Sequence, residues 1–257
     1  YGPSTSTGDG VIMATADGIN AATRLMEYGK RYPNGVEVSK GIAKSTIAGN
    51  ITGWTMSAIL VNAEGERVVN EKASNRTILE AELAQTGSEL FLLMDSETFN
   101  VWKTKLAAAG LTEETIDGYV AANGTTTPVF AHGDTLEEVA AAAGVNGENL
   151  VKTVERYNGF VAAGNDEDFG RSADYMTMAI GDGPYYLVEQ KPRFATTMGG
   201  LVVNASLQVE NTDGDVIPGL YAAGEVVGGV MGDDSPSGAN NGWALTAGKL
   251  AAEAIAE

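Results

Sequence analysis

GLYAAGEVVGG, residues Gly219–Gly229, combines an apolar strand with small residues, a carboxylate and paired glycines. Glycine lets a backbone approach a ligand closely, and an acid at the end of a strand can accept hydrogen bonds from ribose hydroxyls. The stretch therefore predicts part of a nucleotide site. The loops that normally hold the phosphates are missing, because the sequence contains neither G-x-G-x-x-G nor G-x-x-x-x-G-K-[ST].

Composition narrows the class of protein. The 257 residues suffice for one large domain or two small ones. The formal charge of −18 argues against nucleic acid or an anionic membrane as a partner. Without cysteine, this segment can hold no disulfide, iron–sulfur cluster, thiolate zinc site or c-type haem. No apolar run approaches the roughly 20 residues of a membrane span, and no metal site is predicted.

Periodicity and turn residues predict a chain of mixed helices and strands. Strands are expected at 57–62, 67–70, 88–95, 184–192, 200–204, 207–211 and 220–224. Helices are expected at 11–29, 96–110 and 112–124, in two successive stretches within 134–164, and from about Asn240 onward. Asp134 or Thr135 can cap the first of the paired helices, and Asn146 the second. One face of the last helix is expected to carry Trp243, Ala247, Leu250, Ala251 and Ile255.

Ordered motifs carry a resemblance to a known family. They are TTMGGLVVN at 196–204, VIPGLYAAGEVVGGVMG at 216–232 and a final G-x-x-x-G-x-A-x-x-x-G-K-L-A-A, preceded by TGDGVIMA, NAEGERVVNE, LFLLMDSE, TLEEVA, LVKTVERYNGFVAAG and PYYLVEQKP. In this order they resemble the FAD-binding fumarate reductase and succinate dehydrogenase flavoproteins, in the branch of flavocytochrome c and urocanate reductase. The 3-ketosteroid dehydrogenases are more distant relatives. The resemblance covers nearly the whole chain.

The resemblance implies an α+β fold, in which a capping domain of the fumarate reductase flavoprotein type is joined to the C-terminal portion of a Rossmann-like FAD-binding domain. Residues 1–24 would end an FAD-binding segment, 25–184 would form the capping, substrate-binding domain, and 185–257 would return to the FAD-binding domain. In such proteins the dinucleotide fingerprint lies well before TGDG. The chain is therefore expected to be the second half of a flavoenzyme. Its partners would be the missing N-terminal FAD-binding half, a small-molecule substrate and an electron donor that the sequence does not name.

The cofactor implied by the resemblance is FAD, bound by the full-length protein. Backbone N–H groups at the start of the last helix can face the pyrimidine edge of the flavin, and their dipoles would favour its anionic reduced form. The alternative is that Gly228, Gly229 and Gly238 only form turns. The residues expected to contact the cofactor are Gly8, Asp9, Gly199, Gly224, Glu225, Gly238, Ala239 and Asn240.

The fumarate-reducing members hold substrate carboxylates with groups that this chain lacks. Thr196 stands where the family has His, Ser235 where it has Arg, and Asn50 and Ile51 where it has a Thr–Glu pair. A dicarboxylate would meet hydroxyls and an acid in place of guanidinium and imidazole. Fumarate is therefore not the expected substrate. The residues expected to bind another substrate are Thr196, Thr197, Asp234 and Ser235, with a solvated turn as the alternative for Asp233 and Asp234.

Arg76 is the catalytic residue that the resemblance implies, as proton donor or anion-orienting group. Without gaps the family's arginine aligns with Asn75, and a shift of one residue brings Arg76 to the same place. The alternative is a solvated arginine at the start of a helix. Arg67 belongs to the hairpin pattern and is expected to be structural. Packing is favoured for Tyr185 and Tyr186 over proton donation, a surface loop is expected for His132, and Trp54, Met56 and Tyr32 would either line an apolar pocket or pack.

These observations lead to two hypotheses about function. In the first, the full-length protein is an FAD-dependent oxidoreductase that reduces an activated C=C bond, or oxidises CH–CH, by hydride transfer at flavin N5, and the isolated chain is inactive. A 3-ketosteroid dehydrogenase-like enzyme is the runner-up within the same fold. In the second hypothesis, the chain is a non-catalytic ligand-binding module that keeps the fold. An intact protein that is colourless and gains no flavin would favour the second.

Overall fold

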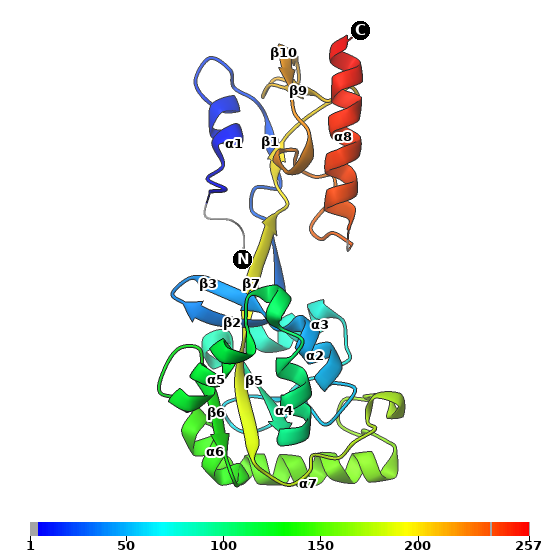
Figure 1. Ribbon diagram of the computed structural model, residues 1–257. Coiled ribbons are helices and arrows are strands. Elements are labelled where there is room, and N and C mark those ends of the chain that lie inside the picture. The colour runs from blue at the N-terminus through cyan, green and yellow to red at the C-terminus, as the bar shows by residue number, and fades with distance from the viewer. Residues whose placement is uncertain (1–4, 237, 257) are drawn as a thin grey trace. The chain divides into compact units, whose positions relative to one another are not determined.

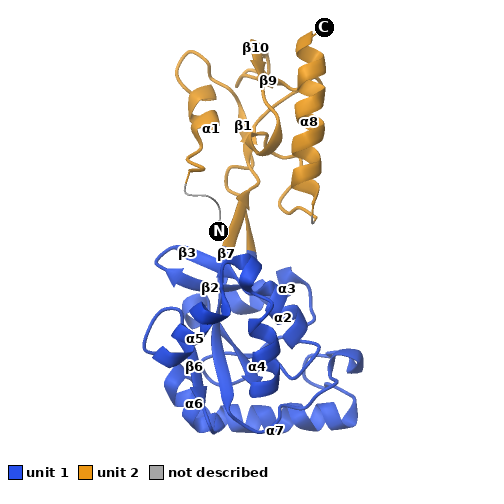
Figure 2. Cartoon of the chain, viewed as in Figure 1, with its two compact units in different colours: residues 1, 32–193 blue, residues 2–31, 194–257 orange. Residues whose placement is uncertain are grey.

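The computed structural model describes residues 5–236 and 238–256, which fall into two compact units (Figure 1, Figure 2). Unit 1 is continuous and comprises residues 32–193. Unit 2 is formed by two segments, up to residue 31 and from residue 194 onward. The chain passes between the units within strands β2 (Gly29–Ser39) and β7 (Tyr185–Thr197). The capping domain expected from the family resemblance, residues 25–184, stays a prediction.

Unit 1 is built on a six-stranded sheet of order β3-β2-β7-β5-β4, in which β6 also pairs with β7. The β5–β7 pairing runs antiparallel from Leu90 opposite Gln190 to Asp95 opposite Tyr185. Every residue of β5 is buried, which confirms the apolar run LFLLMD as an interior strand. The shorter strands are β3 (Ile42–Ser45), β4 (Ile59–Val61), β5 (Leu90–Asp95) and β6 (Phe130–Gly133).

Helices contribute to a hydrophobic core on each face of this sheet. Successive side chains of a strand point to opposite faces, so β5 divides its residues between the two cores. Leu90, Leu92 and Met94 pack in the first core, and Phe91 and Leu93 in the second. The first core is completed by α2 (Ile47–Gly53), α3 (Asn75–Leu83), α4 (Ser96–Lys103) and α5 (Glu113–Ala122), the second by α6 (Leu136–Ala143) and α7 (Gly147–Ala163).

The helix ends of unit 1 follow the sequence expectations. Thr135 forms a capping box with Glu138 at the start of α6, and Asn146 caps α7. Both helices end at a glycine with left-handed backbone, Gly144 and Gly164. Short 3₁₀ turns lie in unit 1 at Thr86–Ser88, Ala107–Ala109 and Ala173–Tyr175. A further 3₁₀ turn, Gly224–Val226, lies in unit 2.

Among its described residues, unit 2 has two α-helices of very different length, α1 (Asp9–Ala14) and α8 (Ala239–Ala256). Its short strands pair antiparallel, β1 (Thr23–Arg24) with β8 (Gly200–Leu201) and β9 (Gln208–Glu210) with β10 (Val216–Tyr221). Small and β-branched side chains dominate its core, which includes Ala14, Ala21, Leu201, Val209, Ala222 and Val227.

Two expectations about local structure are wrong. The helix expected at 11–29 ends early, because Gly18, Asn20 and Leu25 have positive φ of 89°, 54° and 54°, a left-handed backbone that a right-handed helix excludes. The strand expected at 67–70 is reduced to one bridge. On the face of α8 that carries Trp243, Ala247, Leu250, Ala251 and Ile255, Ala247 and Ala251 are buried, whereas Leu250 is 46% and Ile255 62% exposed.

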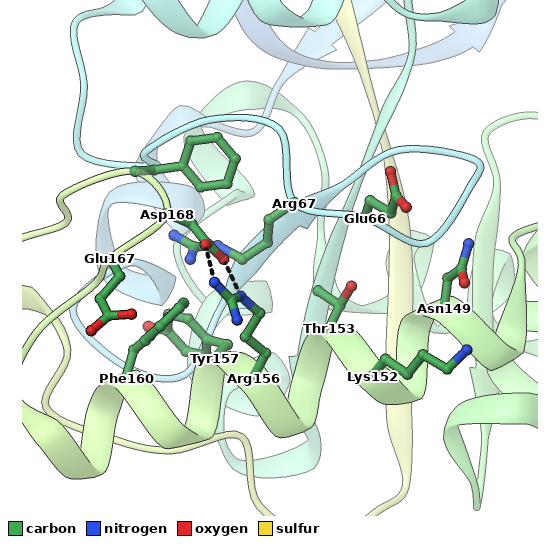
Figure 3. A pocket seen from close by; sticks show the side chains of 11 residues that line it. Glu66, Arg67, Asn149, Lys152, Thr153, Arg156, Tyr157, Phe160, Glu167 and Asp168 are labelled. Atoms are coloured by element: carbon green, nitrogen blue, oxygen red, sulfur yellow. Dashed lines mark hydrogen bonds and ion pairs between the residues drawn. The ribbon is translucent and has the colours of Figure 1, made fainter.

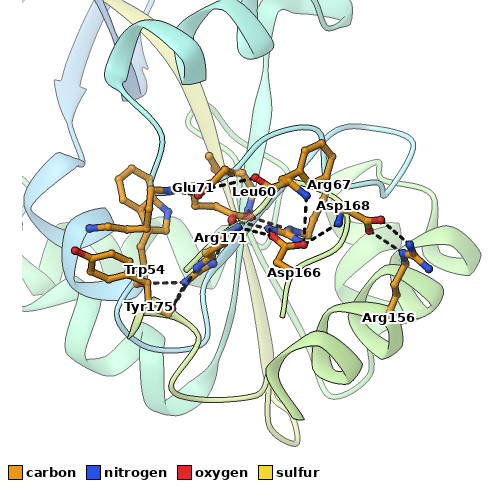
Figure 4. Close-up of polar contacts among 12 residues, drawn as sticks. Trp54, Leu60, Arg67, Glu71, Arg156, Asp166, Asp168, Arg171 and Tyr175 are labelled. Carbon is orange, nitrogen blue, oxygen red and sulfur yellow. Dashed lines mark hydrogen bonds and ion pairs between the residues drawn. The ribbon is translucent and has the colours of Figure 1, made fainter. Parts of the chain in front are cut away.

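A network of two arginines and two carboxylates is buried in unit 1 (Figure 4). Arg67 forms ion pairs with Glu71 at 2.9 Å and with Asp166 at 3.1 Å. Arg171 pairs with the same Glu71 at 3.2 Å. The network joins the loop that follows α7 to the hairpin after β4. Arg67 is thus a structural residue, as expected from the hairpin pattern.

Glu82 gives unit 1 a pH-dependent stability. Its side chain on α3 is buried, and this burial, together with the charge of Glu89, raises its pKa to about 8. The folded state therefore keeps a proton that the unfolded state releases near the ordinary value of 4.5. The stabilisation is complete below pH 4.5 and is lost as the pH rises to about 8.

We expect Glu82→Gln to raise the thermal midpoint at pH 8 and to flatten the pH dependence of stability between pH 4.5 and 8. The physical reason is that an amide cannot ionise. Thermal unfolding at several pH values measures the effect. Glu80→Gln, at an exposed position of the same helix, is the control, and it should keep the wild-type pH profile. The same profile in Glu82→Gln would contradict the assignment.

Within residues 5–236 and 238–256, no helix combines the length and apolarity that a membrane crossing needs. The same residues contain no cluster of three or more His, Asp or Glu side chains arranged to hold a metal ion.

Candidate functional site

Two cavities in unit 2 contain most of the site residues expected from the sequence. The larger, of about 610 Å³, is lined by a set that includes Gly8, Asp9, Thr196, Thr197, Gly199 and Glu225. The smaller, of about 270 Å³, is lined by a set that includes Thr196, Thr197, Gly224, Glu225 and Asn240. Both cavities share Glu225 and the backbone from Ala195 to Thr197. The two cavities are therefore neighbours, and together they form the candidate site.

Glu225 stands where the two cavities meet. It lies in the 3₁₀ turn that follows β10, and Gly224 enters this turn with a positive φ of 76°. The hydroxyl of Thr196 donates to Oε1 of Glu225, which joins β7 to the turn. A carboxylate has about four acceptor sites. Glu225 can therefore accept further hydroxyl donors from a ligand.

The glycines of this region serve two purposes. A Cβ atom at Gly199 would lie 2.4 Å from the carbonyl oxygen of Leu25, and one at Gly228 would lie 2.4 Å from the nearest backbone nitrogen. These two glycines let backbone segments pack closely. Gly8 and Gly238 instead have a positive φ of 81°, and a Cβ atom there would meet nothing within 4 Å. Close packing of the backbone therefore requires glycine at Gly199. At Gly8 and Gly238 the left-handed backbone favours glycine, and the space beside each residue is open.

The start of α8 borders the smaller cavity. Asn240 and Asn241 of its first turn line that cavity. First-turn amides have no acceptor within their own helix, and that of Ala239 donates instead to the carbonyl oxygen of Pro236. Nε1 of Trp243 donates to the carbonyl oxygen of Gly224 at 3.0 Å, which holds the helix against the turn that carries Glu225. The helix start thus offers N–H groups and the positive end of its dipole to an acceptor.

Asp234 and Ser235 lie on the loop before α8, where they contact Lys30, a residue that the sequence analysis did not single out. Lys30, from β2, forms an ion pair with Asp234 and donates to the carbonyl oxygen of Ser235. The side chain of Lys30 is 8% exposed and that of Asp234 61%. No sequence signal pairs them, because 205 positions separate Lys30 from Ser235. The negative charge of Asp234 is therefore paired with the positive charge of Lys30.

Arg76 lies at the start of α3 in unit 1, in the turn that Ser74 caps. Its side chain is 72% exposed, and its Nε lies 3.2 Å from Oε1 of Glu80. This exposed ion pair agrees with the alternative interpretation of Arg76, a solvated arginine at the start of a helix. The role of Arg76 as proton donor stays a prediction.

Asn50 and Tyr186 belong to the core of unit 1. Oδ1 of Asn50 accepts a hydrogen bond from Nε1 of Trp102 at 2.8 Å. At the position of the family's Thr–Glu pair, Asn50 is therefore a buried polar residue, whereas Ile51 is exposed. Tyr186 stacks on Phe99, with ring centroids 3.8 Å apart, in agreement with the packing favoured from the sequence. His132 lies in β6 opposite Tyr186 and is half-buried, so the surface loop expected for it is wrong.

A third cavity, of about 470 Å³, lies beside α7 in unit 1 (Figure 3). Charged side chains line it, including Lys152 and the ion pair of Arg156 with Asp168. Tyr157 also lines it, and burial raises the pKa of its hydroxyl to about 12. Among the described residues, none of those expected to bind cofactor or substrate lines this cavity. The candidate site therefore lies in unit 2.

Comparison with known proteins identifies relatives of the chain. A family model described as FAD binding domain matches residues 1–241. Over 253 residues the chain is 34% identical to the fumarate reductase (cytochrome) of Shewanella frigidimarina, which covers 98% of this chain and 40% of that protein. It is 33% identical to the urocanate reductase of Eggerthella lenta, over 88% of this chain and 35% of that protein.

A solved structure shares the fold. The 3-ketosteroid delta1-dehydrogenase from Sterolibacterium denitrificans, in complex with 1,4-androstadiene-3,17-dione, matches with a TM-score of 0.74 and 25% identity, over 99% of this chain and 48% of that one. The expected α+β fold of this flavoprotein type is confirmed. The chain spans less than half the length of each of these proteins. Because the family model matches residues 1–241, the chain belongs to the FAD-binding domain family of flavoproteins, alongside fumarate and urocanate reductases.

Proposed function

We propose that the full-length protein is an FAD-dependent oxidoreductase that reduces an activated C=C bond, or oxidises the corresponding CH–CH bond. The observation that carries this proposal is the pair of cavities that meet at Glu225 and Thr196, in a chain of an FAD-binding family. The chain spans 40% of its fumarate reductase relative. We therefore propose that a separate FAD-binding half completes the site, and that the chain alone does not turn over substrate.

The polar groups of the site fit the flavin end of FAD. Glu225 offers an acceptor for ribityl or ribose hydroxyls, and Asn240 and the amides of the first turn of α8 offer donors. A Cβ atom at Gly238 would meet no described atom within 4 Å outside its chain neighbours, so the backbone at Gly238 borders open space. The phosphates would be held outside this chain, because its sequence contains no glycine-rich phosphate loop.

When bound, FAD supplies hydride transfer between its N5 atom and one carbon of the double bond. The chain's own residues would perform the remaining tasks. The amides at the start of α8 stabilise negative charge through the positive end of the helix dipole. Thr197 would donate its hydroxyl proton to a substrate oxygen, whereas Thr196, whose own proton goes to Glu225, would accept from a substrate donor. Arg76 is the proposed donor of the proton to the second carbon.

We do not propose a dicarboxylate as the substrate. The hydroxyl of Thr196 donates to Glu225, and the ammonium of Lys30 is held by Asp234 and Ser235. Neither position supplies the guanidinium or imidazole that bind two carboxylates well. We propose instead a substrate in which a neutral activating group, such as a carbonyl, lies next to the double bond, because one hydroxyl donor, that of Thr197, suffices for it.

The second candidate function is oxidation of a steroid-like substrate. It is favoured by the similarity to the 3-ketosteroid dehydrogenase structure. It is also favoured by the apolar side of the larger cavity, formed by Val11, Ile12, Met26, Phe194 and Val226. Turnover of a 3-ketosteroid with an artificial electron acceptor, without any reduction of enones, would select this candidate.

Glu225→Ala in the full-length protein is expected to raise the Kd for FAD about thirtyfold, or about 2 kcal/mol, because hydrogen bonds to a charged acceptor are lost. Quenching of flavin fluorescence during titration measures this Kd. The control is Glu253→Ala, which removes a half-exposed carboxylate paired with Lys249 on α8 and should leave the Kd unchanged. A wild-type full-length protein that stays colourless after reconstitution would favour the ligand-binding module over the enzyme.

A further inference from the structure

A buried lysine ties the loop before α8 to strand β2. Nζ of Lys30 donates to the carbonyl oxygen of Ser235, lies 3.4 Å from its Oγ and forms an ion pair with Asp234. The amide of Ser235 in turn donates to Oδ1 of Asp234 at 2.7 Å. All three residues belong to unit 2. They form a closed polar cluster that joins a strand to a distant loop.

The burial of Lys30 makes the loop and the lysine depend on each other. An ammonium group removed from water is destabilising unless its charge is paired and its donors are satisfied. Here the partners belong to the loop, through the carboxylate of Asp234 and the backbone of Ser235. The loop conformation therefore determines whether Lys30 can be buried, and Lys30 in turn holds the loop in place.

The loop is bonded directly to the start of α8. The amide of Ala239 donates to the carbonyl oxygen of Pro236 at 3.2 Å, and Pro236 follows Ser235 in the chain. Asn240, the next residue of the helix, lines the smaller cavity. A movement of the loop would therefore move the N–H groups that the proposed function assigns to the flavin.

We propose that Lys30 is a positioning residue for the flavin, which fixes the start of α8 and sets the electrostatic potential there. The proposal rests on the proposed function. The ammonium of Lys30 is buried and the carboxylate of Asp234 is largely exposed, so water screens the negative charge more than the positive one. The pair leaves a net positive potential that adds to the helix dipole and favours negative charge on the cofactor.

Three variants of the full-length protein test this role through the midpoint potential of bound FAD and the Kd for FAD. Lys30→Met is expected to shift the potential to more negative values and to weaken FAD binding about tenfold, because a charge and its bonds are lost. Lys30→Arg keeps the charge and the donors and should restore both quantities. Asp234→Asn removes the counter-charge, so the potential should shift in the opposite direction, to more positive values.

The opposite signs separate an electrostatic role from a loss of packing. Potentials that shift in the same direction in Lys30→Met and Asp234→Asn, or that stay at the wild-type value, would overturn the proposal. If Lys30→Met does not fold, the potential of the Asp234→Asn variant decides between the outcomes. The exposed carboxylate of Asp234 can be replaced without opening the core. A wild-type protein that binds no FAD would overturn the proposed function as well, whereas normal FAD binding with unchanged potentials would overturn this inference only.

Discussion

Arg171→Met is expected to lower the free energy of unfolding by about 3–5 kcal/mol. Arg171 donates to the carbonyl oxygens of Trp54, Ala58 and Tyr175 at 2.7, 3.0 and 2.9 Å, and it pairs with Glu71 at 3.2 Å. Methionine is a long side chain without a donor, so these carbonyls would lose a donor, and Oε2 of Glu71 would keep only Arg67 as its partner. Because the side chain of Arg171 is fully buried, water does not replace the lost bonds.

Urea unfolding of the chain, followed by circular dichroism, measures this loss. The matched control is Arg156→Met, which removes an exposed arginine whose partner is Asp168. Exposed ion pairs contribute little to stability, so the control should keep the wild-type midpoint. A loss in Arg171→Met no larger than that in the control would contradict a stabilising role for the buried network.

Arg76→Gln in the full-length protein is expected to lower kcat about 100-fold or more, the usual effect of removing a general acid. The expectation rests on the proposed transfer of a proton from Arg76 to the second carbon of the double bond. Because Arg76 is not among the residues proposed to bind FAD, the FAD absorption spectrum and the Kd for FAD should stay unchanged. Steady-state reduction of an enone measures kcat.

Glu80→Gln is the control for this variant, because it breaks the same ion pair of 3.2 Å and leaves the arginine in place. We expect Glu80→Gln to keep the wild-type kcat. Arg76→Lys should retain part of the activity, since an ammonium group can also donate a proton. Equal kcat values for the wild type and Arg76→Gln would show that Arg76 is a solvated surface residue.

Features that depend on neighbouring residues could be predicted from the sequence. The apolar run that forms β5 is a buried strand, and Thr135 with Glu138 forms a capping box at the start of α6. Both follow from side-chain type within a few positions. Glu225 could be singled out for a similar reason, because its strand, glycines and carboxylate are contiguous in the chain.

Features that depend on distant residues could not be predicted in this way. Apolar periodicity favours a helix over 11–29, but Thr23 pairs with Leu201 in a strand, and such tertiary contacts override local helix propensity. Lys30 likewise meets Asp234 only after folding. From the sequence alone, the loop carries the acid Asp234 with no basic residue nearby. In the folded chain, Lys30 of β2 pairs with this acid.

Because unit 1 is continuous and unit 2 is split, the residues of unit 1 are all synthesised before those of unit 2 are complete. Unit 1 is fully translated once residue 193 is added, whereas β1 of unit 2 waits for its partner strand Gly200–Leu201. Domains fold as units while the ribosome adds residues in sequence. A polypeptide that stops soon after residue 193 would thus keep the contacts of unit 1 and lack Thr196 and Glu225, which line both cavities of unit 2, so a nonsense mutation at this point removes the candidate site and spares unit 1.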